Sequence, residues 1–412
     1  MSGLPSLRDW PRLREPAVTA LFEAIGTGGD EIRIVGGAVR DALIGREPRE
    51  IDLATTATPA IVEGRAARAG FRVVPTGVEH GSLTVVRDGQ SFEITTLRED
   101  VETDGRHAVV RFGRDWKADA ERRDFTVNAL SVDADGVVHD PVGGYPDVMA
   151  RRVRFIGDPD QRIAEDRLRL LRLFRFEADF ALAPADAAAH AAAIRARNTI
   201  RELAPERVAN EMRRLVVAGR APEVAVLMQD SGILPIILGG VGYPGQLRRL
   251  ADFEVLAGLS PSVPGRLAAL AARIAEDADR VASRLRLANA ERDAMIAAIE
   301  GAPAFAQPIG EARAQAVRYR LGEPGYSAAL AQAAAMGRRP VNDYLPARNH
   351  VEGWVVPSFP LSGNDVLAAG LTRGPGIGLV LSDLEAWWID RGFLPDRKAL
   401  LERLQQMTVA QQ

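Results

Sequence analysis

Two glycines, an arginine and two carboxylates occur in close succession near the N-terminus, in an order that indicates chemistry on a phosphate. Gly36 and Gly37 follow a short apolar run, and Arg40 lies in a helix-compatible segment directly after them. Backbone N–H groups of glycines at the start of a helix can approach an anion. Glu50 and Asp52 come next, and carboxylate oxygens are ligands that Mg²⁺ prefers. The set predicts a triphosphate cradle beside a divalent-metal site.

Short strands and one helix must position these groups. The apolar run at residues 32–35 predicts a strand, and residues 38–44 predict a helix. The run that carries Glu50 and Asp52 predicts a second strand, on which residues two apart face the same side. A plainer interpretation is a turn, a solvated arginine and exposed acids on an edge strand. The order of the set, which also includes Asp41, favours nucleotidyl transfer, because that reaction needs a phosphate grip, metal ligands and a short connection between them.

Two later segments add candidate residues. Glu93 lies on the second arm of a hairpin predicted around Asp88-Gly89, so it is either a third carboxylate of the site or an exposed strand acid. Arg122, Arg123 and Asp124 precede an apolar run at residues 126–132. They could grip phosphate and ribose, or they could form an ion-paired cap.

A polar stripe runs along the helix predicted at residues 165–180. Asp166, Arg169, Arg172 and Arg175 recur every three residues among apolar neighbours, and Asp166 and Arg169 could meet as an i, i+3 pair. Such a stripe faces either water or a ligand. In the helix predicted at residues 205–218, Arg207 and Glu211 are spaced for an i, i+4 ion pair, which indicates a supporting helix.

The composition is that of a globular protein of several domains. The chain has 412 residues, a net charge of −3 and no cysteine, which excludes disulfides and thiolate chemistry. No apolar run is long enough to span a membrane, and we expect a cytoplasmic protein without a membrane partner. Residues 98–116 are polar and predict a mobile loop, and residues 153–156 predict a last strand. Strand signals then stop, so we expect a domain boundary near residue 158.

Five motifs in order resemble the class II tRNA nucleotidyltransferase and poly(A) polymerase family of the DNA polymerase β superfamily. They are GGAVRD (36–41) with Glu50-Ile51-Asp52, RRDFTVNAL (122–130), DPVGGYPD (140–147), EDRLR (165–169) and ERVANEMRRL (206–215). The resemblance implies an α+β head with a polymerase β-like sheet, followed by an all-α remainder. It divides the chain into a catalytic head (1–158), a base-recognising neck (159–220), and a body (221–340) and tail (341–412) that bind tRNA.

The resemblance also implies a reaction and roles for the candidate residues. The reaction is addition of CCA to the 3′ end of tRNA from CTP and ATP, with Mg²⁺ and release of pyrophosphate. Asp166 and Arg169 would pair with the base edge, because Asp accepts from an exocyclic amine and Arg donates to ring acceptors. The other implied nucleotide-binding residues are Gly36, Gly37, Arg40, Arg123, Asp124, Arg172 and Arg175. Glu50, Asp52 and Glu93 would be catalytic, with Glu50 and Asp52 as the metal ligands, although the family usually has Asp at the position of Glu50.

Several alternatives stay open. A poly(A) polymerase shares the head motifs but typically has a more basic C-terminal region. A specialist that adds only CC or only A depends on the loop at residues 98–113, and a non-catalytic tRNA-binding relative would follow if Glu50 has lost the metal. His139-Asp140 indicates a phosphohydrolase only weakly, because the pair is expected in a turn. A P-loop enzyme is excluded, since neither Lys117 nor Lys398 follows a Gly-rich loop.

Overall fold

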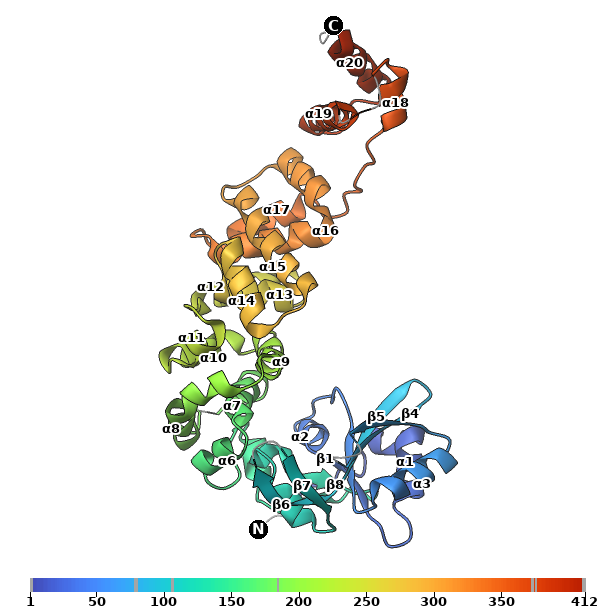
Figure 1. Ribbon diagram of the computed structural model, residues 1–412, viewed down its shortest axis with the longest axis vertical. Helices are drawn as coiled ribbons and strands as arrows, with labels where there is room; N and C mark the ends of the chain where they lie inside the picture. Colours follow the sequence, from blue (N-terminus) through green and yellow to red (C-terminus); the bar gives the residue numbers. More distant parts are fainter. Residues whose placement is uncertain are drawn as a thin grey trace. The chain divides into compact units, whose positions relative to one another are not determined.

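The computed structural model describes residues 3–77, 81–104, 107–183, 185–371, 374 and 376–409 (Figure 1). The chain divides into two compact units, Met1–Ile237 and Leu238–Gln412. Within the described residues, all strands belong to the first unit and the second is helical. The predicted α+β part followed by helices is therefore confirmed, while the division into head, neck, body and tail stays a prediction.

A seven-stranded mixed sheet is the frame of the first unit (Figure 1). Its order is β3-β4-β5-β2-β1-β8-β9, and only β2 and β5 pair in parallel. The strands are β1 (Ile32–Val35), β2 (Asp52–Thr55), β3 (Arg72–Gly77), β4 (Ser82–Arg87), β5 (Gln90–Thr96), β8 (Ser131–Val132) and β9 (Val138–His139). The strand predicted at residues 32–35 is confirmed. Asp88 and Gly89 both have positive φ at the β4–β5 turn, as a two-residue hairpin requires.

Helices surround this sheet and continue beyond it. Helices α1 and α3 begin with a proline, which suits the first helical position, and they pack against each other and against the sheet. The helices of this unit are α1 (Pro16–Ile25), α2 (Gly37–Leu43), α3 (Pro59–Arg68), α4 (Trp116–Glu121), α5 (Tyr145–Met149), α6 (Pro159–Glu165), α7 (Leu168–Asp179), α8 (Ala187–Ala196), α9 (Pro205–Val216), α10 (Ala221–Asp230) and α11 (Ile233–Leu238), with 3₁₀ turns η1 (Pro11–Arg14), η3 (Thr126–Asn128) and η4 (Arg197–Glu202).

Three local predictions were wrong. The expected loop at residues 98–116 contains a two-stranded antiparallel sheet, β6 (Arg98–Asp104) with β7 (His107–Phe112), while residues 105–106 lie outside the described residues. The charged sequence of β6 hides its strand character, because backbone pairing does not depend on apolar side chains. Residues 153–156 contribute one isolated bridge, Phe125 to Phe155, and not a strand. The helix predicted at residues 165–180 is broken at Asp166, whose backbone is extended.

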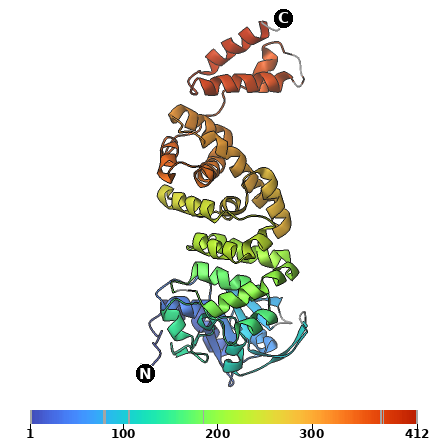
Figure 2. The same ribbon diagram turned by 90° about the vertical axis from the view of Figure 1, so that its left-hand side faces the viewer.

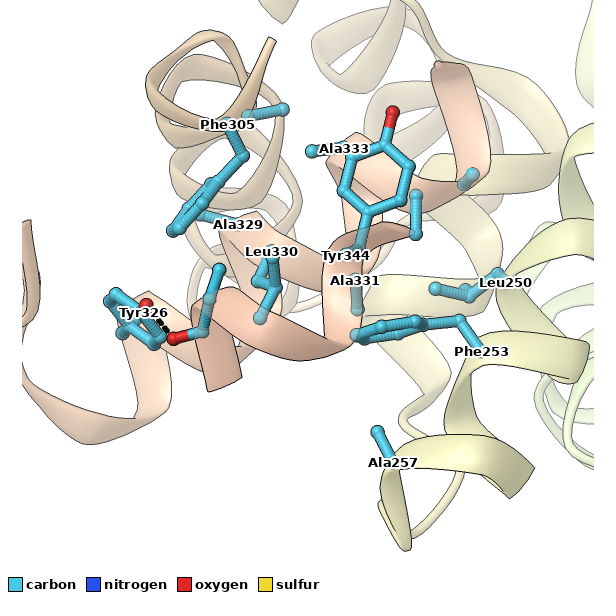
Figure 3. Close-up of a cluster of buried hydrophobic side chains, with 14 of the residues drawn as sticks. Leu250, Phe253, Ala257, Phe305, Tyr326, Ala329, Leu330, Ala331, Ala333 and Tyr344 are labelled. Carbon is cyan, nitrogen blue, oxygen red and sulfur yellow. Dashed lines mark hydrogen bonds between the residues drawn. The ribbon is translucent and has the colours of Figure 1, made fainter. Parts of the chain in front are cut away.

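The second unit is built from helices around an apolar core (Figure 3). Tyr326 is 1% exposed, and its hydroxyl donates a hydrogen bond of 2.6 Å to the carbonyl oxygen of Ala347. The ring of Phe305 meets Tyr326 edge-on at 5.1 Å, a favourable aromatic geometry. The C-terminal helices, red in Figure 2, pack against one another around a separate cluster that includes Trp388; they are α18 (Gly363–Ala368), α19 (Gly376–Asp390) and α20 (Arg397–Val409).

The longest helix of the second unit, α16, contains one non-helical residue, Gly322. Two short elements, η6 and α17, follow it. The elements are α12 (Pro244–Ala257), α13 (Val263–Ala271), α14 (Ala275–Leu285), α15 (Asn289–Gly301), η5 (Ala302–Phe305), α16 (Glu311–Met336), η6 (Val341–Tyr344), α17 (Leu345–Asn349), α18 (Gly363–Ala368), α19 (Gly376–Asp390) and α20 (Arg397–Val409).

Candidate active site

One cleft of about 790 Å³ in the first unit is lined by all the residues that the sequence analysis assigned as catalytic or nucleotide-binding. These are Gly36, Gly37, Arg40, Glu50, Asp52, Glu93, Arg123, Asp124, Asp166, Arg169, Arg172 and Arg175. The structure therefore brings together groups that are far apart in the chain. The sequence reasoning missed several other lining residues, among them Arg46, Asn128 and Arg214, and it gave Arg207 only a supporting role.

The glycine turn lies between β1 and α2. Gly36 has φ +70° and ψ −127°, a conformation that favours glycine, and its N–H donates to the carbonyl oxygen of Leu130 at 3.0 Å. A Cβ atom at Gly36 would lie 3.5 Å from Nη1 of Arg123. The turn therefore brings the backbone close to a guanidinium at the edge of the cleft.

Arg40 is almost fully enclosed rather than free. Its side chain donates to Asp41 at 2.9 Å and to the side-chain oxygen of Asn128 at 3.0 Å. Its guanidinium carbon also lies 5.5 Å and 5.0 Å from the ring centres of Phe176 and Phe180. Packing and pairing hold this cation at one position, so its charge reaches the cleft from a fixed point.

The carboxylates gather at the start of β2 and in the middle of the neighbouring strand β5. Asp52 and Glu93 are register partners of the parallel pair, so they are neighbours across two strands. Glu50 precedes β2, which begins at Asp52; the prediction that both acids lie on one strand was wrong. Burial, and then the charges of Glu50 and Glu93, raises the pKa of Asp52 to about 6, with Arg123 opposing this. Glu50 and Glu93 are therefore each close enough to Asp52 to disfavour its charged form.

These carboxylates are suited to a divalent cation. Within the described part of the chain, no three His, Cys, Asp or Glu side chains are close enough together to hold a metal ion by themselves. Hard cations such as Mg²⁺ are commonly bound by one or two carboxylates plus substrate phosphates. A cation at Asp52 would favour the charged form that burial and then the neighbouring acids disfavour, so the residues present fit the group.

The arginines of the RRD motif are held by a buried acid. Asp119 is 3% exposed. One of its oxygens accepts from Arg122 at 2.9 Å, and the other accepts from Arg123 at 3.1 Å. The ion-paired arrangement considered for this segment is present, and both arginines still line the cleft.

Asp124 connects the same segment to α7. Its carboxylate accepts from Arg172 Nε at 2.6 Å and from the amide of Asn128 at 3.1 Å. Burial by itself would raise the pKa of Asp124, but Arg172 and the hydrogen bonds lower it overall. Asn128 bridges Asp124 and Arg40. The signal that could have identified Asn128 is its place in the RRDFTVNAL motif, four residues after Asp124.

Asp166 and Arg169 do not form the predicted i, i+3 pair. Asp166 lies between α6 and α7, where its carboxylate accepts from the N–H of Leu168 at 3.0 Å and from Nη2 of Arg207 at 3.1 and 3.2 Å. Arg169 pairs with Glu165 at 2.6 Å. The break in the helix is the reason, because it turns Asp166 away from the face of Arg169.

The predicted Arg207–Glu211 pair within α9 is also absent. Glu211 accepts instead from Arg175 Nε at 2.6 Å, and both of these side chains are only 9% exposed. Arg207 reaches Asp166. Helix α9 therefore supports α7 through pairs between the two elements, which a pattern along one helix does not reveal.

The structure does not support the phosphohydrolase alternative, because His139 lies outside the cleft. His139 lies in β9 rather than in a turn, and its Nε2 contacts the carboxylate of Asp133 at 2.8 Å. Neither residue lines the cleft. Separately, no helix in the described ranges combines the length and apolar character needed to cross a bilayer.

Comparison with known proteins agrees with this geometry. Residues 32–154 match the model of the poly A polymerase head domain. The mouse mitochondrial CCA tRNA nucleotidyltransferase 1 is 32% identical over 95% of this chain and 92% of its own length, and the CCA-adding enzyme of Levilactobacillus brevis is 30% identical over 92% and 95%. The Bacillus stearothermophilus CCA-adding enzyme in complex with CTP has the same fold, with a TM-score of 0.78, 24% identity, and coverage of 96% of this chain and 99% of that one. The chain therefore belongs to the CCA tRNA nucleotidyltransferase family and is a nucleotidyltransferase, a class of enzyme that depends on a divalent metal.

Proposed function

We propose that the protein adds CCA to the 3′ end of tRNA, with CTP and ATP as nucleotide donors and Mg²⁺ as the metal. The observation that carries this proposal is one cleft lined both by three carboxylates and by arginines, several of which are held by carboxylate partners. Relatives named as CCA-adding enzymes, including solved complexes with CTP, with ATP and with tRNA, support the choice of substrates.

Each side of the cleft has its own task in this proposal. Asp52 and Glu50 would bind Mg²⁺, with Glu93 as a third acid. Bound there, the metal supplies activation of the tRNA 3′-hydroxyl and charge neutralisation on the triphosphate. Gly36, Gly37, Arg40 and Arg123 would hold the triphosphate and sugar, so that the α-phosphorus is in line with the attacking oxygen and pyrophosphate can leave.

The opposite wall would select the base. Asp166 would accept from the exocyclic amine that cytosine and adenine share, and Arg169 would donate to their ring acceptors. Asp124 would act near the ribose, with Arg172 and Arg175 completing the nucleotide pocket. A cytoplasmic location stays a prediction from the sequence, since several relatives are named as mitochondrial enzymes.

The test uses tRNA transcripts that end before CCA, after C and after CC. Each is incubated with Mg²⁺ and one labelled nucleoside triphosphate. We expect CMP on the first two transcripts, a single AMP on the third and no UMP or GMP. C without A, or A without C, would indicate a partial-end specialist, and a long ladder of AMP would indicate a poly(A) polymerase. Binding of tRNA without any incorporation would contradict the proposal and indicate that Glu50 does not support the metal.

A further inference from the structure

The carboxylate of Asp166 is aimed by its neighbours and not by its own helix. Its backbone has φ −144° and ψ 106°, between the end of α6 and the start of α7. A helical turn does not orient a side chain in such a junction. Instead, two donors hold the Asp166 carboxylate in place: the N–H of Leu168 and the guanidinium of Arg207.

Arg207 is well anchored for this task. It lies in the first turn of α9, and one turn further Glu211 forms the buried pair with Arg175 of α7. That pair fixes α9 along α7. The contact between Arg207 and Asp166 is itself half-exposed, with side-chain exposures of 51% and 36%, so it contributes little to folding stability. The contact therefore determines the direction of the Asp166 carboxylate rather than the stability of the fold.

The remaining hydrogen-bonding capacity fits the proposed substrates. A carboxylate has about four acceptor positions, and Leu168 and Arg207 make three contacts to Asp166, which leaves about one. Arg169 has five N–H donors; three contact Glu165 and the carbonyl oxygens of Arg162 and Arg122. Within the described residues, about one acceptor and two donors stay available. Cytosine offers one amine and two acceptors on its pairing edge, whereas uracil offers no amine.

We infer that Arg207 is a positioning residue for base selection: it holds the Asp166 carboxylate so that one acceptor faces the incoming base. The inference rests on the proposed function, in which Asp166 reads the base. Without Arg207 the carboxylate can rotate and can accept from water, so part of the binding energy of the correct base is used to orient it.

The experiment measures dissociation constants of CTP and UTP by titration calorimetry and steady-state incorporation on tRNA. The variants are Arg207→Gln, Arg207→Lys, Asp166→Ala and the double variant Asp166→Ala/Arg207→Gln. Arg213→Gln is the matched control, since Arg213 lies on the same helix, contacts Asn210 and does not line the cleft. Thermal melting checks that each variant is folded.

We expect Arg207→Gln to lower the preference for CTP over UTP about tenfold, mainly through KM, and Arg207→Lys to restore part of it. In the Asp166→Ala background the Arg207 substitution should have no further effect on the preference. An unchanged preference in Arg207→Gln, or tighter binding of CTP, would overturn the inference. If Asp166→Ala leaves the preference unchanged, the base-reading role in the proposed function fails with it; if only Arg207→Gln is without effect, the proposed function stands.

Discussion

The lining of the cleft has two parts, here called its first and second walls, which differ in how their charges are balanced. On one, Asp52, Glu50 and Glu93 are gathered so that the pKa of Asp52 rises to about 6, first because of burial and then because of its acidic neighbours. On the other, Arg172 and Arg175 each have a carboxylate partner at 2.6 Å. The first arrangement is unfavourable until a cation arrives, and the second is complete without a ligand. The difference supports the proposal that the first wall, with its unbalanced charge, binds the metal and that the second wall, whose charges are already paired, binds the nucleotide.

The largest effect is expected from removal of Asp52, the acid of the first wall that interacts with both of the others. We expect Asp52→Ala to lower the rate of CMP and AMP incorporation by about 10³-fold or more, because the metal would lose a proposed ligand that interacts with both of the other acids. Single-turnover incorporation on a tRNA transcript measures the effect. Glu47→Ala is the control, since Glu47 lies in the same loop and contacts Arg12 outside the cleft. Retained incorporation in Asp52→Ala would refute the assigned edge.

Removing a charge from the second wall should affect folding stability first and nucleotide incorporation second. Arg175→Met leaves the buried Glu211 with only its 4.0 Å contact to Arg172, and we expect a loss of about 3 kcal/mol in the free energy of unfolding. The double variant Arg175→Met/Glu211→Leu should regain most of that loss, because no charge is then left alone. Urea denaturation measures both. Arg195→Met is a control that removes an exposed pair with Asp160 and should change little. A double variant as unstable as the single one would argue against pairing as the cause.

Glu50 tests the first wall further, because its side chain is longer than that of the Asp that the family usually has at this position. Glu50 lies before β2 and not on it, so its side chain can adjust, and we expect Glu50→Asp to stay within about tenfold of the parent rate. Glu50→Ala should lose considerably more, because removal of a carboxylate differs from a change of its length. Incorporation at several Mg²⁺ concentrations separates weaker metal binding from a slower step. Equal rates for Glu50→Ala and the parent would exclude Glu50 as a ligand.

The smallest effect is expected from a pair outside the cleft, between His190 and Glu177 of α7. His190 Nε2 contacts the carboxylate of Glu177 at 2.7 Å. Burial lowers the pKa of His190, but Glu177, with a smaller contribution from Asp186, raises it above its ordinary value of 6.5 overall. A raised folded-state pKa stabilises the protein below pH 6.5, and this contribution is lost as the pH rises through the folded-state pKa.

We expect His190→Gln to remove that pH dependence, which should amount to at most about 1 kcal/mol. Unfolding free energies of the parent and the variant between about pH 5.5 and 8.5 test this. A difference between the two that is constant over this range would show that His190 stays neutral. Nucleotide incorporation should be unaffected at the pH where both are folded, since His190 does not line the cleft.

Much of the fold followed from patterns that are local in the chain. The apolar run at residues 32–35, the glycine pair after it and the Asp88-Gly89 hairpin each depend on a few neighbouring residues. The family could be identified because five motifs occur in order, and the structure gathers the motif residues in one cleft. The hairpin of β6 and β7 was missed, because its strands are defined by backbone pairing rather than by alternation of apolar side chains.

The amino-acid sequence by itself determined which chemical groups are present and in what order: carboxylates, a glycine turn, and a helix rich in arginine. Only the tertiary structure decided their partners. Spacing along a helix predicted Arg207 with Glu211, yet these residues pair with Asp166 and Arg175. The physical reason is that an exposed i, i+4 pair contributes only about 0.3–0.5 kcal/mol. Packing of α9 against α7 and the break at Asp166 bring other partners within reach, and at a buried site a paired charge is far less costly than an unpaired one.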